Sequence, residues 1–384
     1  MKNLSTIRSL RDLPQPEPSL GIEAYRQERE YALAADPRRR ANYEKYSRAH
    51  RRSADVDYMP IKLDIENVSR CNFRCTMCVV SDWPKGQRAG DMSLDDFKAI
   101  IDEQYGLVEI KLQGIGEPTL QGDEFFAMIR YARESHIWVR TTTNASLLHL
   151  RENYRKLVDS GPNEIQISVD GADKETFEKI RRGSVFERVI ANCRTINAYC
   201  KEKESPVTKM WTVVQRDNVH QLEDLVDLAA ELGFPSYVLS LNLSDWGIEA
   251  WAERNRAATV EDSLTVDRLA SLVERGAAQG LKVRFWNVVD KYETESPDKL
   301  CPWPFERAYV SSDSRVVPCC FLGNPDVFEF PREGKSIADI WQGPAYSAFR
   351  QAHLDGQIPE VCRGCYVCSH SDDDNSTSPG VHPN

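Results

Sequence analysis

Between residue 60 and about residue 245, short β-type runs alternate with amphipathic helical stretches, and this alternation constrains the fold more than any other feature. Such alternation is typical of parallel βα units. Strands are predicted at 61–66, 107–112, 138–143, 164–169, 209–215 and 237–241, with helices beginning near Ser93, Gly122, Leu148, Lys174 and Asn218. We therefore expect an α/β fold, a partial (β/α)6 barrel, with its chemistry where strands end and loops begin.

The segments on either side of this region differ from it in composition. Residues 1–58 are polar, with Arg and Glu at helical spacing, and predict a helical N-terminal extension. The barrel domain is expected to span 59–290, and its last part reads as a helix followed by a strand at 281–288. Residues 291–372 hold six of the eleven cysteines and predict a small metal-binding domain, and 373–384 predict a flexible tail.

The charge and the absence of long apolar stretches narrow the partners of this 384-residue chain. Its formal net charge of -10 argues against nucleic acid or an anionic membrane as the main partner. No secretory signal is evident, and no stretch approaches the roughly 18 apolar residues of a spanning helix. We expect a cytoplasmic protein that acts on a small molecule or a peptide. In that compartment cysteines bind metals more often than they form disulfides.

The first cysteine group follows the first predicted strand directly. Cys71, Cys75 and Cys78 form a CxxxCxxC array. Three thiolates on one short loop can hold one face of a four-iron cluster and leave one iron open. Zinc is an alternative, although it would require a fourth Cys or His nearby. Three buried structural thiols are the other alternative.

Polar residues follow three further strands of the predicted sheet. Gly116-Glu117-Pro118 follows the second strand, Asn144 follows the third, and Ser168 and Asp170 close the fourth. Each could be only a turn or a cap. Because parallel strands bring their carboxyl ends to one edge, we expect these groups to meet near the cysteine loop.

Taken together, these segments resemble the radical S-adenosylmethionine (radical SAM) superfamily. In that family the open iron chelates the amino and carboxylate groups of S-adenosylmethionine (SAM), and the reduced cluster cleaves SAM to a 5'-deoxyadenosyl radical. Ile115 stands where the family more often has glycine. The resemblance implies that Cys71, Cys75 and Cys78 hold a 4Fe-4S cluster, and that SAM is bound by Phe73, Gly116, Glu117, Asn144, Ser168, Asp170 and Val214.

The second cysteine group resembles the auxiliary-cluster module of radical SAM enzymes, the SPASM domain or its shortened form, the twitch domain. The resemblance implies one auxiliary 4Fe-4S cluster, the second of the chain, held by Cys301, Cys319, Cys362 and Cys365. A zinc ribbon is the alternative. Cys320 and Cys368 are left over. Either one replaces a neighbour in the ligand set, or a spare thiol donates a hydrogen atom to a substrate radical and is a candidate catalytic group.

The two clusters suggest a first hypothesis about the reaction. Hydrogen-atom abstraction from an alcohol, followed by electron transfer to the auxiliary cluster, would give a ketone. We therefore expect a dehydrogenase or epimerase acting on a sugar, an aminocyclitol or a related alcohol, supplied with electrons by a one-electron reductant such as flavodoxin or ferredoxin. The candidate substrate contacts are Asn242, Asp245, Trp246, Arg284 and Trp286.

Two other functions remain open. A peptide maturase would modify a ribosomally made precursor. Such enzymes often carry a winged-helix domain that binds the leader peptide, and residues 1–58 look too short and too helical for one. A non-catalytic iron-sulfur scaffold is the third possibility, but it would have no need of the polar loops at Gly116-Glu117-Pro118 and Ser168-x-Asp170.

Overall fold

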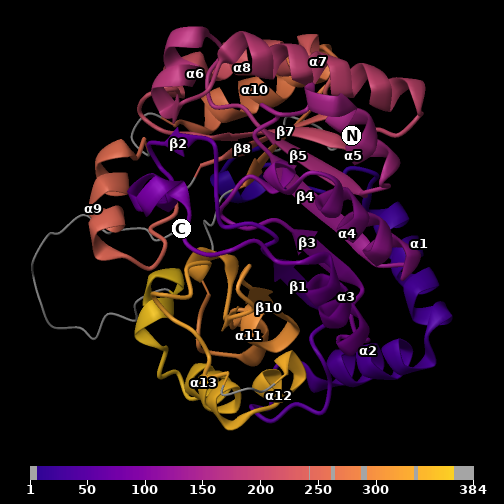
Figure 1. Ribbon diagram of the computed structural model, residues 1–384. Helices are drawn as coiled ribbons and strands as arrows, with labels where there is room; N and C mark the ends of the chain where they lie inside the picture. Colours follow the sequence, from indigo (N-terminus) through magenta and orange to yellow (C-terminus); the bar gives the residue numbers. More distant parts are fainter. Residues whose placement is uncertain (1–6, 242, 261–263, 287–291, 333–335, 367–384) are drawn as a thin grey trace, which may run out of the picture.

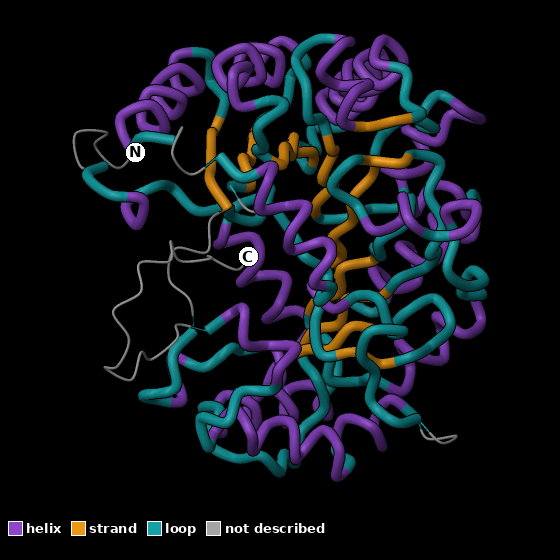
Figure 2. The backbone as a smooth tube through the Cα atoms, turned by 90° about the vertical axis from the view of Figure 1, so that its left-hand side faces the viewer, coloured by secondary structure: helices purple, strands orange, loops and turns teal. Residues whose placement is uncertain are grey.

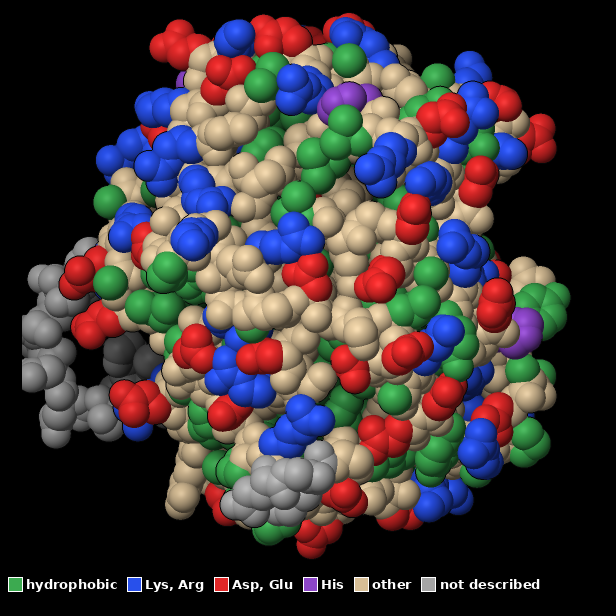
Figure 3. All heavy atoms as spheres, in the orientation of Figure 1, with side chains coloured by type: hydrophobic (Ala, Val, Ile, Leu, Met, Phe, Trp, Pro, Cys, Tyr) green, Lys and Arg blue, Asp and Glu red, His purple; other side chains and the backbone are tan. Residues whose placement is uncertain are grey.

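The computed structural model describes residues 7–241, 243–260, 264–286, 292–332 and 336–366. Within these ranges, none of the helices combines the length and the apolar character that crossing a membrane requires. On the face of the molecule in Figure 3, basic and acidic side chains are interspersed.

A nine-stranded sheet forms the centre of the molecule, with strand order β11-β10-β1-β3-β4-β5-β7-β8-β9. Every pairing is parallel except that between β10 and β11. The predicted α/β fold with a parallel sheet is confirmed, and the sheet extends beyond the six expected strands at both ends. Its strands are β1 (Lys62–Ile65), β3 (Glu109–Leu112), β4 (Trp138–Thr143), β5 (Glu164–Ser168), β7 (Thr208–Val213), β8 (Ser236–Ser240), β9 (Lys282–Trp286), β10 (Arg307–Val310) and β11 (Val316–Val317).

Helices cover the outside of this curved sheet, as Figures 1 and 2 show. Ser93 caps the first helix after β1, where its Oγ accepts a hydrogen bond from the Asp96 amide at 3.0 Å. The helix predicted near Leu148 begins later, at Asn153, after Arg151 and Glu152 adopt positive φ. The covering helices are α3 (Leu94–Glu103), α4 (Asp123–Glu134), α5 (Asn153–Asp159), α6 (Lys174–Ile180), α7 (Phe186–Glu202), α8 (Leu222–Glu231) and α10 (Val266–Ala278).

Strand alternation gives the barrel an apolar outside and a polar inside. In β5, Ile165 and Ile167 are fully buried in the hydrophobic core, whereas Gln166 and Ser168 line a cavity. Successive strand residues point to opposite faces, so the same division recurs around the sheet. The interior therefore carries the groups that can meet a ligand.

The N-terminal segment covers the end of the barrel where the strands begin. The Ser19 amide donates to Glu164 Oε2 at 3.1 Å, and the Tyr25 hydroxyl donates to Glu109 Oε2 at 2.8 Å. Two helices follow on the outside, α1 (Ile22–Ala35) and α2 (Pro37–Ala49). With that end covered, the opposite end, where the strands finish, carries the open cavity.

The C-terminal part is joined to the barrel through the sheet itself. β10 lies beside β1 in parallel register. The Arg350 guanidinium, fully buried, donates to the carbonyl oxygens of Pro304 at 2.7 Å and Trp341 at 2.9 Å. The helices of this part are α11 (Trp303–Glu306), α12 (Ile337–Trp341) and α13 (Pro344–Leu354).

Replacing Lys209 with Met should destabilise the fold. Lys209 Nζ lies 2.7 Å from Glu164 Oε2, and both side chains are buried. Its removal leaves a buried carboxylate short of one partner, so the free energy of unfolding should fall by about 3 kcal/mol in chemical denaturation. As a control, Arg275→Met removes a half-exposed ion pair with Asp227 and should change stability little. Equal losses in the two variants would contradict this.

Candidate active site

A cavity of about 350 Å³ opens where the barrel strands end, and all three cysteines of the first motif line it. Residues from both halves of the chain meet there. The cluster loop contributes Cys71, Cys75 and Cys78, and the C-terminal part contributes Tyr309 and Cys320.

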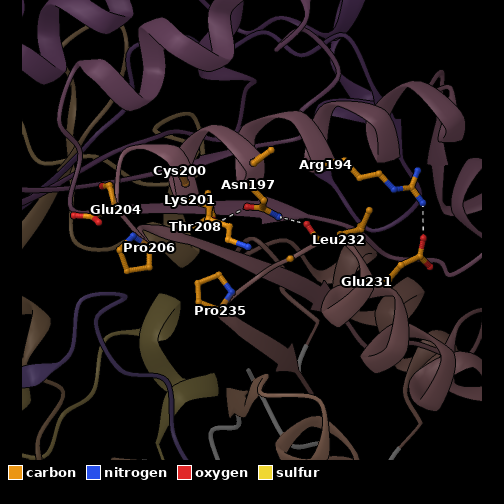
Figure 4. A pocket seen from close by; sticks show the side chains of 13 residues that line it. Arg194, Asn197, Cys200, Lys201, Glu204, Pro206, Thr208, Glu231, Leu232 and Pro235 are labelled. Carbon is orange, nitrogen blue, oxygen red and sulfur yellow. Dashed lines mark hydrogen bonds and ion pairs between the residues drawn. The ribbon is translucent and has the colours of Figure 1, made fainter.

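A second hollow, of about 590 Å³, lies on the outside of the barrel along α7 and α8 (Figure 4). There the Arg194 guanidinium points to Glu231, and the Asn197 side chain joins Thr208 to the Leu232 carbonyl. Cys200 is the only thiol among its lining residues, and it is buried. This hollow therefore lacks the cysteine group that defines the first cavity.

A short antiparallel pair holds the cysteine loop at the cavity. In it, β2 (Arg74–Cys75) lies against β6 (Arg181–Arg182), with Cys75 opposite Arg181. The Arg74 guanidinium donates to the carbonyl oxygens of Cys71 at 2.6 Å and Phe73 at 2.7 Å. The backbone of the loop is thus bonded within the protein, which leaves the three thiols to face the cavity.

Burial raises the pKa of all three thiols, that of Cys78 to about 12. Glu117 adds to the effect at Cys71. The thiols are consequently protonated at neutral pH when no iron is bound. Since iron binds thiolates, loading this site must release protons.

The loop after β3 approaches the cysteine loop closely. A Cβ atom on Gly116 would lie 2.4 Å from the Arg70 carbonyl oxygen, so only glycine fits. The adjacent Glu117 carboxylate is buried and accepts hydrogen bonds from Thr143 Oγ1 at 2.6 Å and from the Asn144 amide at 2.7 Å. Burial raises the pKa of Glu117, and these bonds oppose the rise.

Most of the predicted SAM contacts line the cavity. These are Phe73, Gly116, Glu117, Asn144 and Ser168. Asp170 does not line it, because its carboxylate is turned to the Arg181 guanidinium, 2.7 Å away, and accepts from the Val213 amide at 2.8 Å. Arg181 itself lines the cavity. Asp170 therefore reaches the cavity only through Arg181.

Three other predicted positions need correction. Val214 is buried in the hydrophobic core, and its neighbour Val213 lines the cavity instead, because adjacent strand residues face opposite sides. Arg284 is turned toward Glu17, 3.8 Å away, in the segment that covers the other end of the barrel. Asp245 accepts a hydrogen bond from the Gly247 amide at 2.9 Å and does not line the cavity.

Two of the remaining predicted substrate contacts line the cavity, and the third lies outside the described residues. Trp246 and Trp286 line the cavity. Trp246 donates from its indole nitrogen to the Met77 carbonyl of the cysteine loop at 3.3 Å. Asn242 and the spare Cys368 lie outside the described residues.

The C-terminal cysteines form a second group. The pKa of the Cys319 thiol is raised well above its usual value by burial, and also by Cys320, Cys362 and Cys301. Cys365 similarly raises the pKa values of Cys301 and Cys362. The four predicted auxiliary ligands therefore lie near enough to affect one another's pKa, and their role as ligands stays a prediction. Cys320, on the 3₁₀ helix η10 (Cys320–Leu322), instead lines the cavity of the first cysteine group.

The two walls of the cavity are joined by one buried carboxylate. Glu66, at the end of β1, accepts hydrogen bonds from the Ile115 amide at 3.1 Å and the Ser312 amide at 3.1 Å. Arg88 donates to the same carboxylate at 3.0 Å and also pairs with Asp313 at 2.9 Å. Glu66 thereby fixes the loop after β3 to the turn that follows β10.

Several cavity residues escaped the sequence predictions. They lie within strands and not in the loops that follow the strands. The sequence feature that could have identified them is a polar or aromatic residue at a strand position that faces the barrel interior. These residues are Asp64, Lys111, Gln166, Trp211 and Tyr309. Arg181, which directly follows α6, was also absent from the predicted site residues although it lines the cavity.

Comparison with known families agrees with this geometry. Residues 66–229 match the model of the radical SAM superfamily, and residues 301–366 match that of the SPASM iron-sulfur cluster-binding domain. The chain therefore belongs to the radical SAM superfamily and carries a SPASM domain. It binds SAM, a 4Fe-4S cluster and auxiliary iron-sulfur, and the donor set described above, thiols beside a glycine cradle and buried polar groups, fits them.

Individual relatives show what the chain is similar to. A protein of Rhodopseudomonas palustris named PqqA peptide cyclase is 26% identical over 319 residues, which cover 81% of each chain. A tungsten-containing aldehyde ferredoxin oxidoreductase cofactor-modifying protein of Pyrococcus furiosus is 27% identical over 75% of this chain and 82% of its own. The structure of Streptococcus suis SuiB bound to precursor peptide SuiA shares the fold, with a TM-score of 0.61 at 18% identity over 84% of this chain and 75% of that chain.

These relatives overturn the first hypothesis about the reaction. A dehydrogenase or epimerase of sugars, aminocyclitols or related alcohols is wrong, as is the expected small-molecule partner, since the relatives that match over four-fifths of the chain are named peptide cyclases. The error has a chemical origin: an auxiliary cluster can accept an electron from any substrate radical, so a second cluster does not specify an alcohol.

Replacing Cys319 and Cys320 separately with Ala should distinguish their roles. Because the Cys319 thiol lies with Cys301 and Cys362, its loss should reduce the iron of the reconstituted protein by about one cluster, whereas Cys320→Ala should keep the wild-type iron content. Iron and sulfide analysis with electron paramagnetic resonance (EPR) of the reduced proteins measures this. Iron loss in Cys320→Ala would reverse the two assignments.

Proposed function

We propose that this protein is a maturase that modifies a ribosomally made precursor peptide. The observation that carries the proposal is the similarity to the PqqA peptide cyclases, which extends over four-fifths of both chains. A match of that extent covers more than a shared cofactor motif. The fold shared with SuiB agrees with it.

In this proposal residues 59–290 hold the cofactor and residues 291–372 hold the auxiliary cluster. Cys71, Cys75 and Cys78 ligate the first cluster. SAM bound there supplies hydrogen-atom abstraction from an unactivated carbon of the peptide. Phe73, Gly116, Glu117, Asn144 and Ser168 are the proposed SAM contacts, because they line the cavity beside the cysteine loop.

The rest of the cavity is proposed to take a side chain of the peptide. Trp211 and Trp286 lie with their rings 6.3 Å apart on one side, and Trp286 is 42% exposed at the mouth. Aromatic walls at an open mouth suit a side chain that enters from solvent while the peptide backbone stays outside. The described part of residues 1–58 covers the opposite end of the barrel. The peptide is therefore proposed to bind at the end that carries the cavity.

Electrons are proposed to enter and leave through iron-sulfur clusters. Cys71, Cys75 and Cys78 would hold the cluster that a one-electron donor such as flavodoxin or ferredoxin would reduce. The auxiliary cluster is proposed to be held by Cys301, Cys319, Cys362 and Cys365, and to accept the electron that the peptide loses. Cys320 lines the cavity of the first cysteine group, and hydrogen donation from Cys320 or Cys368 stays an untested prediction.

Co-expression tests the proposed function. Each short open reading frame beside the gene is expressed with the protein, and the peptide mass is measured. We expect one peptide to lose two hydrogen atoms for each bond installed, and to stay unmodified with the Cys75→Ala variant, which cannot hold the first cluster.

The contradicting result is equally specific. If the reconstituted protein forms 5'-deoxyadenosine from SAM but every neighbouring peptide keeps its mass, the substrate is not such a peptide. Formation of 5'-deoxyadenosine on addition of a cofactor precursor would then favour the relationship to the cofactor-modifying protein.

A further inference from the structure

Asp64 lines the same cavity as Cys320 of the C-terminal part. It is a β1 residue, and the strand register places it level with Lys111 on β3 and Tyr309 on β10. All three residues line the cavity. Asp64 is nevertheless only 4% exposed, so its carboxylate meets the cavity and little bulk solvent.

The Asp64 carboxylate differs from the other buried carboxylates of the site. Glu66, Glu117 and Asp170 each accept hydrogen bonds from the protein. Among the described residues Asp64 accepts none, and its one ion pair, to Arg307 Nη1, is long at 3.9 Å. Burying a carboxylate that accepts no hydrogen bonds lowers the stability of the fold, unless a bound ligand donates those hydrogen bonds. Its oxygens are therefore available to a group inside the cavity.

Burial makes the Asp64 carboxylate more ready to take a proton, and the surrounding cations limit this effect. Burial raises its pKa, and Arg307, Lys111 and Arg140 oppose the rise, while Glu109 adds to it. Tyr309 and Cys320 are the other titratable groups at this wall. Burial favours the protonated form of a carboxyl group and nearby cations favour the ionised form, and at Asp64 the effect of burial is the larger.

Asp64 is also close to one of the C-terminal cysteines. Cys320 lies close enough to Asp64 for the carboxylate to raise the pKa of its thiol. The preceding residue, Cys319, lies with Cys301 and Cys362. Asp64 thus lines the cavity of the first cysteine group and lies near Cys320, the neighbour in sequence of the predicted auxiliary ligand Cys319.

We propose that Asp64 is the catalytic proton acceptor of peptide oxidation, an inference that rests on the proposed function. When a bond joins two positions of the peptide, two bonds to hydrogen break and one new bond forms. One hydrogen leaves as an atom to the SAM-derived group. The other leaves as a proton to the Asp64 carboxylate, and its electron passes to the oxidised auxiliary iron-sulfur cluster. The proton then returns to solvent through the cavity mouth.

The test compares Asp64→Asn with a matched control, Asp102→Asn, on the exposed face of α3. The reconstituted proteins are given SAM, dithionite and the peptide identified by co-expression. Peptide affinity is measured by fluorescence anisotropy, SAM cleavage by 5'-deoxyadenosine, and product by mass. In Asp64→Asn we expect affinity and iron content within about twofold of wild type, continued SAM cleavage, and at least about 100-fold less product.

Two further readouts separate proton transfer from a structural effect. Freeze-quenched Asp64→Asn should accumulate an organic radical in EPR, because the peptide radical cannot lose its proton. Asp64→Glu keeps a carboxylate, so product formation should return to within about tenfold of wild type. Asp102→Asn should match wild type in every measurement.

Each result bears on a separate claim. Undiminished product from Asp64→Asn overturns the proton-acceptor role. Loss of peptide affinity in Asp64→Asn, with no product from Asp64→Glu, also overturns it and makes Asp64 a binding group. Absence of product with wild-type protein and every peptide rejects the proposed function itself, and this inference falls with it.

Discussion

The pairing of Arg74–Cys75 with Arg181–Arg182 is the constraint on which the site depends. Three thiols in CxxxCxxC spacing face one cavity only if the backbone between them is bonded elsewhere. The antiparallel pair and the Arg74 guanidinium provide those bonds. The same pair places Arg181 in the cavity, where Asp170 neutralises it from behind. One local contact thus positions both the cysteine loop and the Arg181 side chain beside it.

Glu66 extends this constraint to the C-terminal part. Because its buried carboxylate accepts from Ile115 on one loop and from Ser312 on another, the two sides of the cavity cannot move apart without breaking hydrogen bonds to a buried carboxylate. The parallel pairing of β10 with β1 acts in the same direction. The second cysteine group is therefore held at a fixed place relative to the first, as the proposed electron transfer between clusters would require.

Sequence reasoning reached the strands and the loops after them, because alternating apolar runs and cysteine spacing are local signals. It failed where a tertiary contact decided the outcome. Arg284 was predicted to face a substrate, but Glu17, far away in sequence, draws it to the other end of the barrel. Val214 was predicted to contact SAM, but Val213 lines the cavity. The sequence indicates that side chains alternate between the two faces of a strand, but it does not show which of two neighbours faces the interior. The neighbours Cys319 and Cys320 have the same chemistry, and only the fold separates them.

The substrate class was the largest failure, and its cause is chemical. The cofactor supplies hydrogen abstraction whatever the substrate, and the motifs that bind it say nothing about the molecule beside it. Under the proposed function, information on the substrate would lie in inward strand residues such as Asp64, Lys111 and Trp211, which single-sequence patterns do not distinguish from core residues. Only when the barrel is assembled do they form one surface.

The most direct measurement is an anaerobic crystal structure of the holoprotein with SAM and its precursor peptide. The account predicts SAM on the cluster at Cys71, Cys75 and Cys78, and a peptide side chain in the cavity between this cluster and Asp64. A peptide bound instead in the hollow beside Arg194 and Glu231, with the cavity closed to it, would contradict the account.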